Sequence, residues 1–342
     1  MFDLIAIGDV TIDTFIKLDT IASLQCTKDH QHCSLCIPFG TKLGVSQVQR
    51  LWGGNSGNAA VGSSRLGLKS ALYSEVGNDT DGKTIFDSLN KNKVSTTYFV
   101  RDKHRHTNVH YVLDYNAERT ILVHHQPRSY HVPKLAPSKW VYFSSAGQGG
   151  EKMFTPLLKY HQSTNAQIAF NPGTYQSELG LQKLKPILQH SGILFLNTEE
   201  AQLLLGNSQR NFPFLLQKLH DFGPHTVVIT DGNNGSYCFD GMDYWYCPIY
   251  QVPVIEMTGC GDAFATGFVC ALIYDKSIPE ALRWGSVNAA GVIQQVGPQA
   301  GLLHLPKLRK IISINPKFQP RICSGKEVTN HKVYYPTRYR KF

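Results

Sequence analysis

The sequence has no long hydrophobic run and no leader-like start. The longest apolar window, residues 263–274, is too short to span a bilayer. The first residues enter a strand-like apolar run directly, without a basic segment followed by an apolar signal stretch. We therefore expect a cytoplasmic protein with no membrane partner. Internal repeats and low-complexity linkers are also lacking, so 342 residues with 42% hydrophobic content predict one large α/β domain with a small appendage.

Acidic residues are scarce at the C-terminal end. Residues 303–342 contain ten Lys or Arg and one acid, Glu327, so this stretch (ten minus one) carries the whole net charge of +9. A basic tail with interleaved tyrosines could contact RNA or another polyanion. Charge runs are more often solvated, here as an extension packing over the body through its aromatic residues. We treat 304–342 as a basic C-terminal extension and do not expect nucleic acid as a partner.

The eight cysteines lack the second well-spaced Cys-x-x-Cys pair that would indicate zinc strongly. Cys33 and Cys36 form one such pair, and Cys26 lies upstream with His30 and His32 between. Three thiolates and an imidazole could build a tetrahedral zinc or iron site. The alternative is ordinary reduced thiols, as is usual in the cytosol. A structural metal at Cys26, Cys33 and Cys36 is therefore one of two hypotheses.

Strand-like runs alternate with helix-patterned segments along most of the chain. The strand-like runs are residues 4–8, 70–76, 140–144, 167–171, 193–197 and 226–230. The helix-patterned segments are residues 58–66, 82–92, 154–161, 199–205 and 212–222. This alternation predicts a parallel sheet with helices on both faces. Residues 14–52 and 98–125 break the pattern with alternating strands, and we predict that they form a small β lid.

Residues 256–268 place a glycine-rich turn before an apolar helix. Gly259 and Gly261 allow the backbone to bend around a ligand, and the free N–H groups of the helix start favour an anion. Asp262 lies at that position and has no covalent role there, so it suits a general base. The alternative is that Asp262 only caps the helix.

Two loops earlier in the chain carry groups that suit a polyol. Gly53 and Gly54 allow close backbone approach, and the amide of Asn58 can pair with ligand hydroxyls, although a capping Asn after a plain glycine loop is the alternative. Asp13 follows the first strand, at the sheet edge where open α/β folds bind ligands. Asp9 is as apt to brace a turn there.

Two later loops suit a metal–phosphate group. Asn197 and Glu200 follow an apolar run and share a helix face, where they could order the water shell of Mg²⁺ or simply form a capping box. The second loop, residues 230–235, contains Thr230, Asp231, Gly232 and Gly235. Its turn chemistry fits nucleotide phosphates or a plain loop or hairpin.

In this order the motifs resemble the ribokinase-like (PfkB) carbohydrate kinase family over residues 1 to about 303. The ordered set is Gly8-Asp9 with Asp13, Gly53-Gly54 with Asn58, Val76-Gly77-Asn78-Asp79 followed by Gly82, Glu118-Arg119-Thr120-Ile121, Asn197 with Glu200, Thr230-Asp231-Gly232, and Thr258-Gly259-Cys260-Gly261-Asp262. The resemblance implies a ribokinase-like three-layer sandwich with a mainly parallel central sheet and a small β lid. The kinase domain would span 1–303.

The same resemblance implies a role for each motif. Asp262 would be the general base, with the backbone amides of Gly259, Cys260 and Gly261 as the anion hole. The remaining implied sites are Asp13, Gly53, Gly54 and Asn58 for the acceptor, Asn197 and Glu200 for Mg²⁺ through water, and Thr230, Asp231, Gly232, Gly235 and Asn288 for ATP. A monovalent cation is a further candidate cofactor. Glu256 stands where the family usually has Asp, and Met257 where Thr is common.

We therefore predict an ATP-dependent kinase that phosphorylates a primary hydroxyl of a free sugar. A nucleoside kinase of the same family is the first alternative. A non-catalytic nucleic-acid- or metal-binding protein on the same fold is the second. The apolar strands of the lid also suggest a homodimer formed through the lid.

Overall fold

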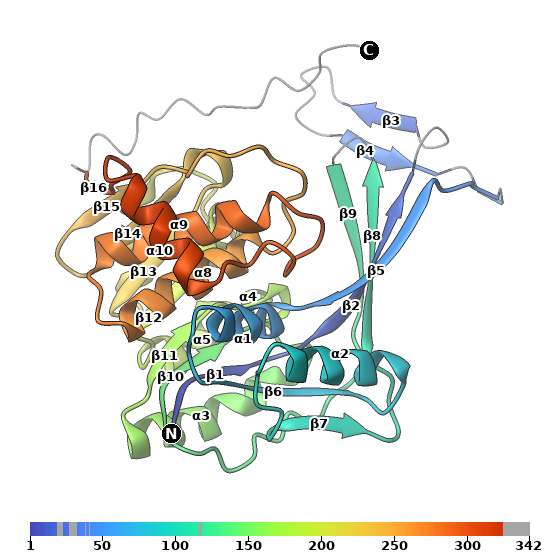
Figure 1. The fold of residues 1–342 in the computed structure, drawn as a ribbon, viewed down its shortest axis with the longest axis horizontal. Coiled ribbons are helices and arrows are strands. Elements are labelled where there is room, and N and C mark those ends of the chain that lie inside the picture. The colour runs from blue at the N-terminus through green and yellow to red at the C-terminus, as the bar shows by residue number, and fades with distance from the viewer. Residues whose placement is uncertain (19–22, 27–32, 38, 41, 116–117, 324–342) are drawn as a thin grey trace.

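The computed structural model describes residues 1–342 except 19–22, 27–32, 38, 41, 116–117 and 324–342 (Figure 1). Its main sheet contains β1 (Phe2–Ile7), β6 (Ser70–Gly77), β7 (Phe99–Asp102), β10 (Ser138–Phe143), β11 (Gln167–Phe170), β12 (Ile193–Asn197), β13 (Thr226–Thr230), β14 (Ser236–Phe239), β15 (Tyr244–Cys247) and β16 (Arg321–Ile322). The strand order is β16-β15-β14-β13-β12-β11-β10-β1-β6-β7. Pairing is parallel from β7 to β13 and antiparallel from β13 to β16.

Helices cover both faces of this sheet. One face packs against α1 (Asn55–Arg65), α2 (Thr80–Lys91), α8 (Cys260–Ile273), α9 (Ile278–Val292) and α10 (Leu305–Ile314). The other packs against α3 (Phe154–Thr164), α5 (Leu181–Leu188), α6 (Thr198–Leu205) and α7 (Phe212–His220), with the short α4 (Thr174–Glu178) beside α6.

The sequence of β1 shows why both faces are covered. Leu4 and Ala6 point into the first core and Ile5 and Ile7 into the second, as the two-residue period of a strand requires. A strand buried on both faces reads as a continuous apolar run. The prediction of a three-layer α/β sandwich is confirmed.

A smaller sheet projects from one side of the main domain (Figure 1). It has the order β5-β2-β8-β9, from β2 (Thr11–Lys17), β5 (Gln47–Gly53), β8 (Asn108–Tyr115) and β9 (Glu118–His124). Beyond it lies the hairpin of β3 (Ser23–Cys26) and β4 (Cys33–Cys36). The expected second lid segment, 98–125, starts too early, because β7 pairs with β6 and so extends the main sheet.

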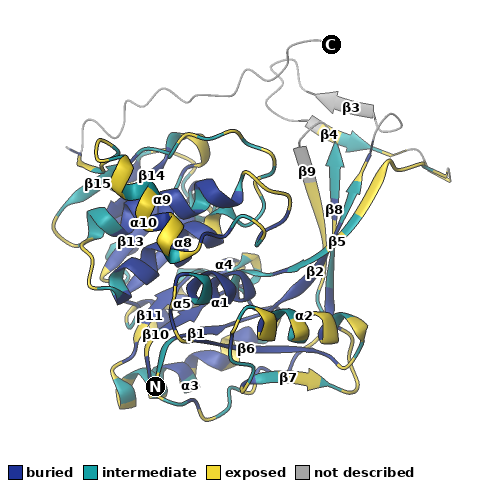
Figure 2. Ribbon diagram, viewed as in Figure 1, coloured by how far each residue is buried: buried dark blue, intermediate teal, exposed yellow. Residues whose placement is uncertain are grey.

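Exposure differs sharply between the two sheets (Figure 2). Strand β6 and most of β1 are buried, whereas the first half of β5 is largely exposed and residues 120–124 of β9 are exposed. The exposed side chains of the smaller sheet include Val48, Ile121, Leu122 and Val123. These apolar side chains are the basis of the homodimer expectation, which stays a prediction.

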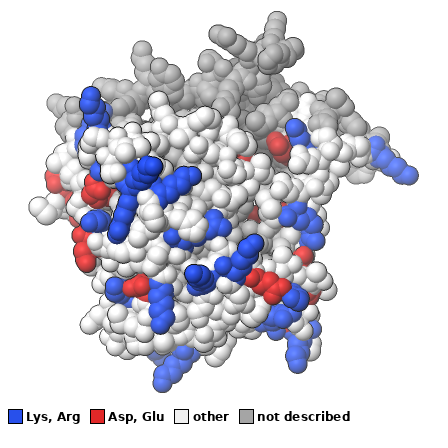
Figure 3. Space-filling view, viewed as in Figure 1, with Lys and Arg blue, Asp and Glu red and all other residues white. Residues whose placement is uncertain are grey.

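The C-terminal part begins with α10 and β16, which pack on the main domain. Leu308 of α10 is fully buried, and Nη2 of Arg283 donates to the carbonyl oxygens of Ile312 and Asn315 at 3.2 and 3.3 Å. Residues 304–323 therefore share the core of the main domain, and the rest of the expected extension lies outside the described residues. On the face in Figure 3, basic side chains are spread over much of the surface, and acidic side chains lie among them in places. No helix in the described part of the chain is long and apolar enough to cross a membrane.

Candidate active site

The N-terminal ends of α1 and α8 meet at the carboxyl edge of the main sheet. There Nδ2 of Asn58 donates to Oδ2 of Asp262 at 2.7 Å, although the two residues are 204 positions apart. In parallel sheets the loops that follow the strands gather at this edge, and helix N-termini turn their free N–H groups toward it. Two motifs that the sequence could only place separately thus form one hydrogen-bonded pair.

Asp262 is a nearly buried carboxylate, 9% exposed. The pKa of Asp262 is raised to about 6, mainly by burial. The hydrogen bond from Asn58 opposes this rise, and the negative charge of Asp13 adds to it. A carboxylate with that pKa is ionised at neutral pH and is a stronger proton acceptor than an ordinary Asp.

The backbone before Asp262 is held in one conformation. Gly259 precedes α8 at φ +78°, and a Cβ there would lie 2.5 Å from Cβ of Pro298. The carboxylate of Glu256 accepts hydrogen bonds from the Thr258 N–H at 2.6 Å, from the Thr258 hydroxyl, and from the Gly297 N–H at 3.1 Å. Glu256 therefore ties the loop before α8 to the loop at 297–299.

Two clefts flank this loop. Thr258, Gly259 and Asp262 line the first, which encloses about 900 Å³, and Met257, Cys260 and Gly261 line the second. We name the first the acceptor cleft and the second the apolar cleft. Because the residues of this one short segment line both clefts, a ligand in the first cleft would meet a ligand in the second at the start of α8.

The acceptor cleft collects polar groups from the first half of the chain. Asp13 lines it and accepts from the Thr11 hydroxyl at 2.9 Å. Gly54, at φ +95°, also lines it, and a Cβ there would lie 2.7 Å from the Asp9 carbonyl oxygen. Gly53 does not line the cleft; its Cα faces the Asp13 carboxylate, where a Cβ would lie 3.1 Å away. Asp13, Gly54, Asn58 and Asp262 thus share one cleft, and their contact with an acceptor stays a prediction.

Asn197 and Glu200 form the capping box that was one of the two expectations. The Asn197 N–H donates to Oε2 of Glu200 at 2.8 Å, and the Glu200 N–H donates to Oδ1 of Asn197 at 2.7 Å. Glu200 also lines the acceptor cleft, and burial raises its pKa to about 7, opposed by the Asn197 hydrogen bond and assisted by the charge of Asp262. Its carboxylate oxygens suit the water shell of Mg²⁺.

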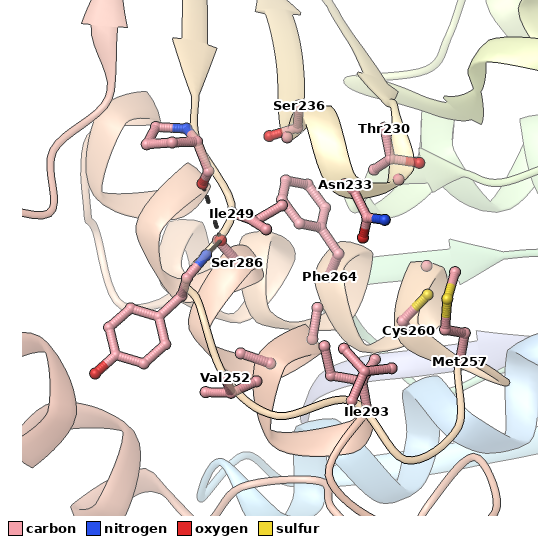
Figure 4. A pocket seen from close by; sticks show the side chains of 18 residues that line it. Thr230, Asn233, Ser236, Ile249, Val252, Met257, Cys260, Phe264, Ser286 and Ile293 are labelled. Atoms are coloured by element: carbon pink, nitrogen blue, oxygen red, sulfur yellow. Dashed lines mark hydrogen bonds between the residues drawn. The ribbon is translucent and has the colours of Figure 1, made fainter. Parts of the chain in front are cut away.

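The apolar cleft lies between the β13–β14 hairpin and α9 (Figure 4). Thr230, Asn233 and Ser236 stand at its polar side. Its apolar walls are Ile249, Val252, Phe264 and Ile293. Gly232 and Gly235 line it from the hairpin turn. An apolar slot beside glycine-rich turns suits a flat heterocycle attached to phosphates.

Two residues predicted to bind the nucleotide do not line the apolar cleft, so a direct contact of either with the nucleotide stays a prediction. Asn288 is fully buried; its Nδ2 donates to the Ala263 carbonyl oxygen at 2.8 Å and its Oδ1 accepts from the Leu303 N–H at 3.1 Å. The next residue, Ala289, lines the cleft instead. The carboxylate of Asp231 accepts from the Thr198 hydroxyl at 2.8 Å and from Nδ2 of Asn234 at 3.0 Å, and it pairs with Arg210. Both residues brace the walls of the site.

Sequence reasoning missed several residues of the acceptor cleft. His110 of β8 and His125, just after β9, both line it. Oδ2 of Asp9 accepts from the Tyr130 hydroxyl at 2.8 Å and from the Gly147 N–H at 2.9 Å. The two-residue alternation of 108–114 places His110 on the same strand face as Asn108 and Val112, which was the one available signal. Nothing local in the sequence distinguishes His125.

The metal hypothesis for Cys26, Cys33 and Cys36 stays a prediction. In the β3–β4 hairpin Cys26 pairs with Cys33, and Cys36 pairs with Ser23. The side chains of Cys26 and Cys33 lie outside the described residues. Within the described part of the chain, no three His, Cys, Asp or Glu side chains are arranged so that they could hold a metal ion.

The chain belongs to the pfkB family of carbohydrate kinases, whose family model matches residues 21–305. It is 25% identical to a ribokinase of Haemophilus influenzae over 282 residues, 78% of this chain and 90% of that protein. Among solved structures, it is similar to Arabidopsis thaliana ribokinase complexed with ribose and ATP, with TM-score 0.75, 18% identity and 91% and 98% of the two chains covered. A Burkholderia thailandensis nucleoside kinase in complex with inosine gives TM-score 0.75 at 17% identity, covering 93% and 98%.

The family match gives the chemistry at its coarse level. The chain is a carbohydrate-family kinase, a phosphotransferase with an alcohol group as acceptor. ATP is the phosphate donor that the family implies.

Proposed function

We propose that the protein transfers the γ-phosphoryl group of ATP to a primary hydroxyl of a free, uncharged sugar, with Asp262 as the general base. One observation carries the proposal: the acceptor cleft and the apolar cleft meet at Asp262 and the first turn of α8. An acceptor hydroxyl in the first cleft and a triphosphate entering from the second would face each other at a carboxylate and a helix N-terminus.

The steps follow from what each group can do. Asp262 accepts the proton of the acceptor hydroxyl as the oxygen bonds to the γ-phosphorus, and the bond from that phosphorus to the bridging oxygen of ADP breaks. Backbone N–H groups of Gly259, Cys260 and Gly261 stabilise the charge on the transferring group. Glu200 would hold Mg²⁺ through water, and the ion would supply positive charge to the phosphates. A monovalent cation is a further proposed cofactor, with no residue assigned to it.

The charge of the acceptor cleft selects the kind of acceptor. Among the described lining residues there are five carboxylates and no Lys or Arg; the carboxylates are Asp9, Asp13, Glu178, Glu200 and Asp262. Carboxylates accept hydrogen bonds from sugar hydroxyls and repel phosphate or carboxylate groups. The cleft therefore favours an unphosphorylated, non-acidic acceptor.

A nucleoside remains the second candidate because of the smaller sheet. Ile121 and Val123 of β9 line the acceptor cleft and offer apolar surface that a nucleobase could cover. We propose that this sheet acts as a lid that closes on the acceptor and excludes water.

A panel of acceptors tests the proposal. ADP release is measured with ribose, fructose, adenosine, inosine, fructose 6-phosphate and gluconate, each against a no-acceptor control. We expect turnover with a neutral sugar, and a higher kcat/KM for adenosine or inosine would select the nucleoside alternative. Preference for fructose 6-phosphate or gluconate would contradict the charge argument.

The base assignment predicts the behaviour of Asp262→Asn. Removing the proton acceptor while keeping its shape should lower kcat by about 10²–10⁴-fold and leave the folded state intact. Circular dichroism and the kinetic assay are measured on the same preparation. Asp221→Asn, an exposed carboxylate after α7, is the matched control. Turnover of Asp262→Asn within a few-fold of the control would refute the assignment.

A further inference from the structure

Four side chains form a continuous chain along the acceptor cleft. Nδ1 of His110 lies 3.4 Å from Oδ1 of Asp13, and Nε2 of His110 lies 3.0 Å from Nε2 of His125. Nδ1 of His125 in turn lies 3.2 Å from Oδ2 of Asp9. The two imidazole rings stack with centroids 5.1 Å apart. The order is therefore carboxylate, imidazole, imidazole, carboxylate, and all four residues line the cleft.

This geometry limits where the protons can lie. Nδ1 of His125 is hydrogen-bonded to Oδ2 of Asp9, so it carries a hydrogen. Nδ1 of His110 is at ion-pair distance from Oδ1 of Asp13, and a lone pair there would be repelled by that carboxylate, so a hydrogen is favoured on this atom too. With a hydrogen on each Nδ1, two neutral rings would present lone pairs to each other across the 3.0 Å between the Nε2 atoms. A hydrogen bond between the Nε2 atoms then requires one further proton, which is a single positive charge between two carboxylates.

The surroundings favour one positive charge here. Apart from Asp9 and Asp13, the cleft residues that carry charge are Glu178, Glu200 and Asp262, all acids, whereas the Tyr130 hydroxyl and the Gly147 N–H already donate to Asp9. Arg128 is the nearby buried cation, and its Nη2 donates to Oδ1 of Asn108 at 3.2 Å. Oδ1 of Asp9 is buried and has no hydrogen-bond partner among the described residues. An acceptor hydroxyl could satisfy it.

We propose that His110 and His125 share one extra proton between their Nε2 atoms, and that this charged pair is a positioning element for the acceptor. The pair orients the Asp13 and Asp9 carboxylates by donating to both. Without the shared proton the two Nε2 lone pairs repel, the rings separate, and both carboxylates lose a donor. The positioning role rests on the proposed function, whereas the shared proton does not.

Nitrogen NMR tests the shared proton without any substrate. The full chain is labelled with ¹⁵N-histidine, and His110→Gln and His125→Gln assign the two residues among the 14 histidines. At neutral pH we expect two protonated Nδ1 atoms and one proton divided between the Nε2 atoms. Two neutral rings with independent titrations would overturn the proposal. So would stoichiometric zinc in the purified protein with metal-bound Nε2 shifts, because the ion would then replace the proton.

Kinetics test the positioning role once the panel has identified an acceptor. His110→Gln and His125→Gln should raise the acceptor KM about tenfold, with kcat changed by less than about twofold. In the native protein the acceptor KM should rise toward alkaline pH as the shared proton leaves, and in either variant this pH dependence should disappear. His124→Gln is the matched control, since His124 is exposed on β9 and contacts Gln126.

The NMR experiment tests the shared proton and the kinetic experiment tests the positioning role, so each can contradict its own part of the proposal independently. An unchanged acceptor KM in both variants, at every pH, would overturn the positioning role even if the NMR result holds. If no member of the panel is phosphorylated, the proposed function fails, and the NMR result still decides whether the proton is shared.

Discussion

The base of the proposed reaction gains its basicity from where it is placed. Asp262 lies at a helix N-terminus, which by itself would favour its charged form. Burial acts in the opposite direction and is the larger effect, so the pKa of Asp262 rises to about 6. Asn58 limits the rise through one hydrogen bond. The result is a carboxylate that is ionised at neutral pH yet accepts a proton readily.

This pKa predicts the pH dependence of turnover. Because the base must be ionised, kcat should fall about tenfold per pH unit below the pKa of Asp262, which is about 6 before the substrates bind, and stay level above it. Saturating acceptor and MgATP isolate kcat from binding. The histidine pair acts on the acceptor KM toward alkaline pH, so the two effects fall on different parameters. A kcat that stays constant down to pH 4.5 would contradict Asp262 as the base.

The same shift predicts a gain in stability when the charge is removed. The folded-state pKa of Asp262, about 6, exceeds the ordinary 3.8, so the native state binds this proton more tightly than the unfolded state. The stability that this proton contributes is fully present below about pH 4 and is lost as pH rises through 6. Asp262→Asn should therefore raise the free energy of unfolding by about 2 kcal/mol at pH 8.

Urea unfolding at pH 4 and pH 8 measures this difference. The gain should be much smaller at pH 4, where Asp262 is protonated in the folded state and partly protonated in the unfolded state. Asp221→Asn, which is exposed, should show no such pH-dependent gain. If Asp262→Asn were equally stable or less stable at pH 8, the buried charge of Asp262 would not be destabilising the folded state.

At the scale of elements, two glycines in one loop make different demands. Gly259 adopts φ +78°, and a Cβ would meet Pro298 at 2.5 Å. Gly261 has no protein atom within 4 Å of the Cβ position. The first glycine is thus required by the fold, and the second leaves open space beside the apolar cleft that it lines.

This contrast separates folding from ligand binding. Gly259→Ala should lower the free energy of unfolding by about 1–3 kcal/mol and reduce activity with it. Gly261→Ala should leave thermal stability nearly unchanged. It should still weaken the binding of ATP, because the added methyl group enters the space where a phosphate approaches. Thermal unfolding and the ATP KM are compared for both variants. Normal ATP kinetics in Gly261→Ala would argue against an anion hole at this turn.

The capping box of α6 shows one element serving two purposes. Asn197 and Glu200 satisfy each other's backbone N–H groups, and Glu200 still reaches the acceptor cleft. The structural and the functional interpretation of this motif were alternatives in the sequence. They are compatible because a carboxylate oxygen can accept a hydrogen bond and still face a ligand shell.

For the whole molecule, the C-terminal elements complete the core on the face that carries α9. Residues 324–342 form part of the basic charge run that we expect to be solvated, so removing them should leave stability and kcat within experimental error. Removing 304–342 also deletes α10, with its buried Leu308, and the hydrogen bonds of Arg283 to the Ile312 and Asn315 carbonyls. Each buried large side chain lost costs about 2–5 kcal/mol, so this longer truncation should unfold or aggregate.

Thermal unfolding of the two truncated proteins measures the contrast. A longer truncation as stable as the full chain would place the end of the domain at 303, as the sequence suggested. Gel shifts with RNA on the full chain and on the shorter truncation test the tail separately, since a polyanion site there would be lost without loss of kinase activity.

The sequence alone determined the architecture and the order of the site loops. Continuous apolar runs mark strands buried on both faces, and the motifs that contain Asp13, Asn58 and Asp262 can be recognised in order along the chain, because both signals are local. Only the tertiary structure decided which polar groups face a ligand. Asn288 and Asp231 turned inward because buried amides and carboxylates take whatever partners surround them. His110 and His125 met for the same reason: residues distant in the chain are brought together only when sheets and helices pack.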